Sequence, residues 1–89
     1  MPEKKKGKYT TNLCGHRVKV ARVDNNMTQL DLALALNAEA DLRVDQTSIG
    51  ALENGNRLVK DFELVALAKI LGKHPMWLLF GDDIPSEFK

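Results

Sequence analysis

The stretch that decides the fold is MTQLDLA at Met27–Ala33, followed after a polar connection by QTSIGALENG at Gln46–Gly55. Each half has the pattern of a short capped helix with one apolar face and one small, mostly uncharged polar face. Thr28 and Asp45 are favourable N-cap residues, and Gly55 suits the end of the second helix. The two halves therefore predict a pair of short helices joined by a turn.

Outward from this pair, apolar residues recur at helical spacing in three more segments. A first helix is expected from residue 12 or 13 to 24, a fourth with Asp61 as its N-cap up to Gly72, and a fifth from Pro75 to about residue 80. Asn25 and Asn26 supply turn chemistry after the first helix. The expected inward-facing residues are Leu13, Val18, Ala21, Leu30, Leu32, Ala33, Leu36, Ile49, Leu52, Leu64, Leu67, Ala68, Leu71, Trp77 and Leu78. No segment has the pattern of a strand, so the predicted fold class is all-α with five helices.

The length of 89 residues suits one domain. We expect a flexible basic arm at 1–11, a helical domain at 12–81 and an acidic tail at 82–89. The arm carries Lys4, Lys5, Lys6 and Lys8. Two interpretations of the arm stay open, because a basic arm either follows DNA phosphates or is simply a solvated tail.

Composition excludes several classes of protein. The formal charge is only +1, from 13 basic and 12 acidic residues, so a basic surface has to come from local clustering. The single cysteine excludes an internal disulfide, and no apolar run approaches the roughly 20 residues of a membrane span or forms the core of a signal peptide. We therefore expect a cytoplasmic protein without a membrane partner.

No catalytic constellation can be assembled from this sequence, so we expect neither an enzyme, nor a cofactor, nor a small-molecule substrate. Cys14, His16 and His74 are the residues to consider as metal ligands. Two residues that lie two positions apart on a helix do not share a face, and no fourth ligand is close in the sequence. A metal site is therefore not predicted.

The ordered set of residues resembles the lambda-repressor-like, Cro-type helix-turn-helix regulators of bacteria and their phages. The resemblance covers about residues 15–81 and rests on Gly15, Val18, Arg22, Thr28, Gln29, Leu32, Ala33, Thr47, Ser48, Ile49, Leu52–Gly55, Leu71, Gly72 and Trp77–Gly81. It implies a compact five-helix domain whose second and third helices form the helix-turn-helix. The spacing from Leu32 to Ile49 is about six residues longer than usual, so either the second helix or the turn is extended.

The resemblance implies that the third helix enters the major groove of double-stranded DNA. The predicted DNA-binding residues are Gln29, Gln46, Thr47, Ser48, Gly50, Ala51, Asn54, Asn56 and Arg57. Gln46 is the best candidate for reading a base, since its amide can pair with adenine through two hydrogen bonds, although it is also acceptable as a plain surface residue. Gly50 and Ala51 are expected on the same exposed side, where Gly50 either admits DNA backbone or is merely tolerated.

The remaining predicted residues act on the sugar-phosphate backbone. Gln29 is expected to contact a phosphate and to brace the third helix, as the family glutamine does. Asn54, Asn56 and Arg57 are expected to hold the neighbouring backbone, with a solvated loop charge as the alternative for Arg57. The resemblance also implies a structural ion pair between Arg22 of the first helix and Glu53 at the end of the third.

The function predicted from these observations is a sequence-specific DNA-binding transcriptional regulator, expected to be a repressor of phage, mobile-element or host-operon type that binds an operator. A homodimer is expected through the fifth helix and the tail, Trp77–Phe88, because two heads read half-sites one DNA turn apart. The alternative is a protein-interaction module with the same fold, such as an antitoxin or an anti-repressor partner. The near-neutral charge and the small residues Gly50 and Ala51 favour that alternative.

Overall fold

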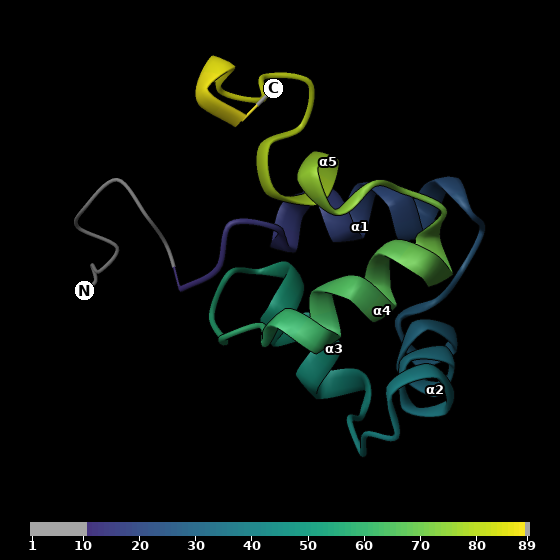
Figure 1. Cartoon of the computed structure of the whole chain (residues 1–89). Helices are drawn as coiled ribbons and strands as arrows, with labels where there is room; N and C mark the ends of the chain where they lie inside the picture. Colours follow the sequence, from purple (N-terminus) through teal and green to yellow (C-terminus); the bar gives the residue numbers. More distant parts are fainter. Residues whose placement is uncertain (1–10, 89) are drawn as a thin grey trace.

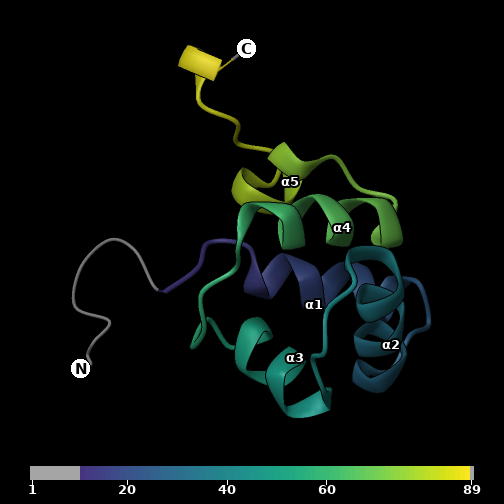
Figure 2. The ribbon, with the colours of Figure 1, turned by 60° about the horizontal axis from the view of Figure 1, so that its bottom comes forward.

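The computed structural model describes residues 11–88. These residues form helices α1 (Gly15–Asp24), α2 (Gln29–Ala40), α3 (Gln46–Glu53), α4 (Asp61–Leu71) and α5 (Pro75–Phe80), followed by the short 3₁₀ helix η1 (Ser86–Phe88). Residues 11–88 contain no strand, so the predicted all-α class is confirmed. Figures 1 and 2 show α2 beside α4, with α1 lying against α3, α4 and α5.

The ends of the helices follow from local chemistry. At the start of α2, the hydroxyl of Thr28 accepts the backbone N–H of Asp31 at 3.0 Å, and the Asp31 carboxylate accepts the N–H of Thr28 at 2.9 Å. At the start of α3, the Asp45 carboxylate accepts the N–H of Ser48 at 2.8 Å. These bonds satisfy N–H groups that have no partner within their helix. The caps predicted for α2 and α3 are confirmed.

Two predicted helix starts were wrong. α1 begins at Gly15 and not at residue 12 or 13, because the Asn12 side chain accepts the N–H of Gly15 at 2.7 Å and so ends the irregular segment there. The N-cap of α4 is Lys60, while Asp61 is its first residue. The carboxylate that satisfies the cap belongs to Glu63, which accepts the N–H of Lys60 at 3.1 Å.

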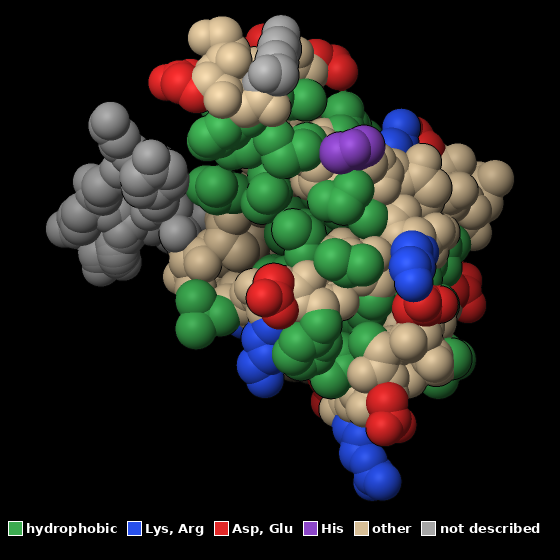
Figure 3. All heavy atoms as spheres, in the orientation of Figure 1, with side chains coloured by type: hydrophobic (Ala, Val, Ile, Leu, Met, Phe, Trp, Pro, Cys, Tyr) green, Lys and Arg blue, Asp and Glu red, His purple; other side chains and the backbone are tan. Residues whose placement is uncertain are grey.

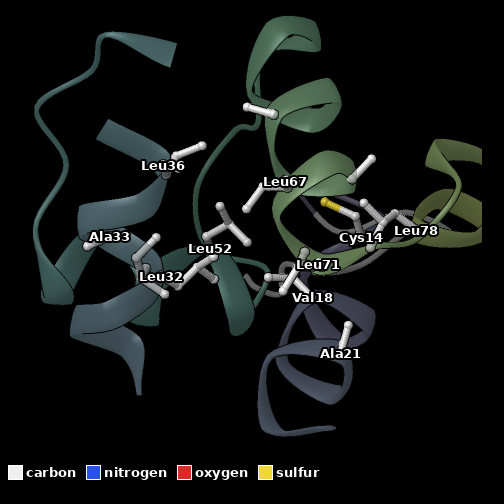
Figure 4. Packing of buried hydrophobic residues seen from close by; sticks show 13 residues of the cluster. Cys14, Val18, Ala21, Leu32, Ala33, Leu36, Leu52, Leu67, Leu71 and Leu78 are labelled. Atoms are coloured by element: carbon white, nitrogen blue, oxygen red, sulfur yellow. The ribbon is translucent and has the colours of Figure 1, made fainter. Parts of the chain in front are cut away.

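The core lies between the helices and draws on all five (Figure 4). Its buried members are Cys14, Val18, Ala21, Leu32, Ala33, Leu36, Ile49, Leu52, Ala66, Leu67, Ala68, Leu71 and Leu78. Leu13 and Leu30 were predicted to face inward but are 42% and 50% exposed. The reason for Leu30 is that α2 is apolar almost all round, while only one of its faces packs against α3 and α4. Leu64 and Trp77 only border the core.

The extra length between α2 and α3 is shared by helix and connection. α2 continues as far as Ala40, and residues 41–45 connect it to α3. Asp41 ends α2 in the left-handed region with φ 54°. The side chain of Asn37 then holds Val44 at both polar groups of its backbone, accepting the N–H at 2.8 Å and donating to the C=O at 2.9 Å. The connection is therefore an ordered part of the domain.

The predicted arm, 1–11, lies outside the described residues except for Thr11. The helices α1 to α5 fall within the predicted domain, 12–81. In the predicted tail, η1 brings the ring of Phe88 to 5.6 Å from the ring of Phe80, measured between centroids. This contact ties the end of the described chain to α5.

Candidate nucleic-acid interface

The helix α3 presents its first residues to solvent. Ile49 and Leu52 are fully buried and fix the inner face of the helix against the core. Gln46 and Thr47 are exposed, directly after the cap made by Asp45. Uncharged polar side chains at an exposed helix start are suited to reach base edges when such a helix lies in a groove.

An ion pair holds the end of α3 to α1, as the resemblance implied. Nε of Arg22 donates to Oε2 of Glu53 at 2.6 Å, and Nη2 donates to Oε1 at 3.2 Å. Arg22 also donates to the carbonyl oxygen of Met27 at 2.7 Å. The two side chains are 10% and 1% exposed, so the pair is shielded from water and its two-pronged geometry fixes α3 in angle as well as in distance.

The bracing role expected for Gln29 is present in the structure. Its side-chain amide donates to Oε1 of Glu53 at 3.1 Å, so the first residue of α2 is joined to the last residue of α3. The same carboxylate therefore holds α1, α2 and α3 together. The phosphate contact expected for Gln29 stays a prediction.

Gly50 lies beside Gln29. A β-carbon at this position would lie 3.7 Å from the amide nitrogen of Gln29, which is an ordinary van der Waals contact. Gly50 and Ala51 are both half-buried, so they are less open to solvent than the exposed Gln46 and Thr47. Gln29, at the start of α2, lies beside Gly50, and within α3 only Gln46 and Thr47 are fully exposed.

The chain leaves α3 through a tight turn. Gly55 has φ 76°, and the N–H of Asn56 returns to the carbonyl oxygen of Ala51 at 2.9 Å. Left-handed backbone of this kind favours glycine. Asn54 and Asn56 lie on either side of Gly55 with exposed side chains. They are the residues after α3 that are free to reach a neighbouring surface.

Arg57 is not a solvated loop charge. Its guanidinium pairs with both carboxylate oxygens of Glu63, at 3.0 Å and 2.9 Å, and donates to the carbonyl oxygens of Ser48 and Leu58. Burial by itself raises the pKa of Glu63, but the hydrogen bonds from Arg57 and Lys60 outweigh it and leave that pKa below its usual value. Arg57 therefore ties the loop after α3 to α4, and four of its five N–H groups are engaged.

Asn12 is a structural residue to which no sequence pattern pointed. Its side-chain amide donates to the carbonyl oxygens of Leu52 at 3.0 Å and of Arg57 at 2.9 Å, while its oxygen caps α1 at Gly15. One side chain thus joins the start of α1 to the end of α3 and to the loop beyond. An asparagine in a polar segment carries no signal for such long-range bonds, which depend on the packing.

The candidate metal ligands do not come together. Cys14 is buried, and burial raises the pKa of its thiol, which keeps it protonated and a poor ligand. Nδ1 of His74 accepts the N–H of Met76 at 3.1 Å at the start of α5. Among residues 11–88 there is no group of three or more potential ligands for a metal ion. None of the helices in this range has the length and apolar character needed to cross a bilayer.

Comparison with known proteins defines the class of this fold and site. The family model described as "Helix-turn-helix" matches residues 18–78, which is more than half of the chain. The chain belongs to this family, the Cro/C1-type helix-turn-helix proteins, and contains a helix-turn-helix DNA-binding domain formed around α2 and α3. Members of this family are typically regulators without enzymatic activity.

A curated relative is the HTH-type transcriptional regulator DicA of Escherichia coli (strain K12), with 35% identity over 75 residues, which is 83% of this chain. The chain spans about half, 51%, of the length of that relative. A comparison with solved structures gave no significant match. Together, the family match and the relative place the chain among the Cro/C1-type helix-turn-helix proteins, whose DNA-binding domain it contains.

Proposed function

We propose that this protein is a transcriptional repressor that recognises a specific operator sequence by inserting α3 into the major groove of double-stranded DNA. The observation that carries the proposal is the open first turn of α3, where Gln46 and Thr47 stand exposed on a helix that Asp45 caps and that α1 and α2 hold through Glu53. Rigid support matters because base recognition depends on side chains being held in place before binding. A phage, mobile element or host operon would be the source of the operator.

Each residue near α3 has a definite part in this proposal. Gln46 pairs with adenine through its amide, and Thr47 and Ser48 contact the adjoining base edges or phosphates. Gly50 and Ala51 allow DNA to approach the helix closely, because their small side chains leave room. Gln29, at the start of α2, and Asn54 and Asn56, after α3, contact phosphates. Arg57 supports this surface through its bonds to Ser48 and Glu63.

We also propose a homodimer through α5 and the tail. Figure 3 shows hydrophobic side chains gathered around α5 on the face drawn in Figure 1. A surface hollow of about 260 Å³ lies there, with Leu13, Val59, Leu64 and Leu79 among its lining residues. A second copy would cover this apolar surface and present a second α3 about one DNA turn away, roughly 34 Å. Light scattering that shows a monomer at high concentration would contradict the dimer.

The proposal is tested by selection from a pool of randomised duplexes at two salt concentrations, followed by titration of the selected duplex with the wild type and Gln46→Ala. We expect an enriched motif, and we expect Gln46→Ala to lose about 1–3 kcal/mol of discrimination at one base pair. Binding to unrelated duplexes should change little. Thermal unfolding serves as the control, since an exposed residue such as Gln46 contributes little to stability.

A second candidate function is binding to another protein through the same fold. The observation that favours it is the charge of the described region. Residues 11–88 contain eight lysines and arginines against eleven aspartates and glutamates, a net formal charge of −3. A DNA-binding surface usually carries a local excess of positive charge. Selection without any enriched sequence, combined with weak binding that depends only on salt, would favour this candidate.

A further inference from the structure

The domain has four arginines, and three of them are committed to internal bonds. Arg17 donates to the carbonyl oxygens of Leu13, Leu78 and Leu79, which fastens α5 to α1. The guanidinium groups of Arg22 and Arg57 are engaged with Glu53 and Glu63, as described above. All four arginines lie within residues 11–88, and among them only Arg43 makes no hydrogen bond or ion pair.

Arg43 stands on an ordered connection. Its neighbours Leu42 and Val44 pack against the core, while Arg43 itself is exposed. The backbone is held on both sides, because the N–H of Leu42 donates to the carbonyl oxygen of Asn37 at 3.3 Å and the side chain of Asn37 binds Val44 at both polar groups. The guanidinium therefore projects from a fixed point, and binding a ligand would cost only side-chain ordering.

The position of Arg43 relative to α3 indicates its partner. Gln46 lies three positions after Arg43, a distance of at most about 11 Å along an extended chain. The major groove is about 12 Å wide, so a long side chain beginning this close to a helix in the groove reaches the phosphates along its edge. Asp41 and Asp45 flank Arg43 and are exposed. The negative charges of the two aspartates repel DNA phosphates. Arg43 is the cation on this connection that counteracts the repulsion.

We propose that Arg43 binds a DNA phosphate at the edge of the groove that α3 occupies, so that the connection between α2 and α3 is part of the binding surface. This inference rests on the proposed function, because it needs α3 in the major groove. It adds a contact made by the extended connection to those made by α3 and by the turn after it. Since phosphate contacts carry no sequence information, Arg43 contributes affinity and orientation, while Gln46 contributes discrimination.

The experiment measures the affinity for the selected duplex between 50 and 200 mM salt for the full chain, Arg43→Gln, Arg43→Lys and Lys69→Gln. Lys69 is the matched control, since it is an exposed cation on α4 that pairs with Glu39 and its loss changes the net charge equally. One phosphate contact contributes about 0.9 to the slope of log affinity against log salt. When the salt concentration rises fourfold, the affinity of the wild type should therefore fall about 3.5-fold further than the affinity of Arg43→Gln.

We expect Arg43→Lys and Lys69→Gln to keep the wild-type slope, and the motif selected by Arg43→Gln to be unchanged. An unchanged slope for Arg43→Gln would overturn the phosphate contact while leaving the proposed function intact. A changed motif would also overturn it, because Arg43 would then be reading a base. If the wild type binds no duplex, the contact and the proposed function both fail. Equal thermal unfolding of all four proteins establishes that the variants are folded.

Discussion

Gly15 lies so close to the carbonyl oxygen of Leu52 that a β-carbon at residue 15 would collide with it, and it would also lie 3.0 Å from the carbonyl oxygen of Glu53. Because both contacts are backbone atoms, no side chain can move aside to relieve them. The absence of a side chain at residue 15 therefore allows the end of α3 to pack on the start of α1.

Gly15→Ala should destabilise the domain by about 1–3 kcal/mol or more, as an overpacked core does. The measurement is the free energy of unfolding from urea titration. α1 and α3 would have to separate, which weakens the bonds of Asn12 to Leu52 and Gly15. A stability equal to that of the wild type would show that the two helices do not approach each other this closely in solution.

Gly50→Ala is the matched comparison, and it should have the opposite effect on stability. The position has room for a methyl group, with the nearest atom of Gln29 at 3.7 Å, and alanine favours a helix over glycine by about 1 kcal/mol. Unfolding in urea should therefore show a gain of up to about 1 kcal/mol. If DNA backbone approaches Gly50 closely, the same variant should bind the selected duplex more weakly, and unchanged binding would remove Gly50 from the interface.

Arg22→Ala should cost about 3–5 kcal/mol, because it leaves the buried carboxylate of Glu53 without its partner. The double variant Arg22→Met with Glu53→Leu should recover much of this stability, since no unpaired charge remains in it. Thermal unfolding followed by circular dichroism measures the stability of both variants. The double variant should still bind DNA poorly if the pair is needed to orient α3. An additive loss in the double variant would contradict the coupling.

The pair of Arg57 and Glu63 should make stability depend on pH. The pKa of Glu63 is lower in the folded protein than its usual value, so the unfolded chain takes up a proton first. The stabilisation is therefore present above the unfolded pKa and is lost as the pH falls through the folded pKa. Glu63→Gln should cost about 1.5–3 kcal/mol at pH 7.

The test of this pH effect is a series of urea titrations of the wild type and Glu63→Gln from pH 7 down to acid pH. The stability difference between the two proteins should shrink as Glu63 becomes protonated. A difference that stays constant over this range would show that the charge of Glu63 does not stabilise the fold.

Local residues were enough to predict much of the fold. The caps at Thr28 and Asp45, the turn at Asn25 and Asn26, and Pro75 at the start of α5 act over four residues or fewer, and their chemistry can be read in the sequence. The predictions for the start of α1 and for the N-cap of α4 were wrong. At these two places the side chains of Asn12 and Glu63 accept backbone N–H groups, and neighbouring residues in the sequence offer competing capping patterns.

The sequence by itself determined the number of helices, the inner face of α3 and the polar residues at its start, because spacing and capping are properties of neighbouring residues. Only the tertiary structure decided which side chains are free to bind. Arg57, predicted for a phosphate, is held by Glu63, and Gly50 lies beside Gln29, whereas Arg43 remains open. The physical reason is that these partners lie on different segments, and the packing of the helices around the buried apolar core sets the distance between them.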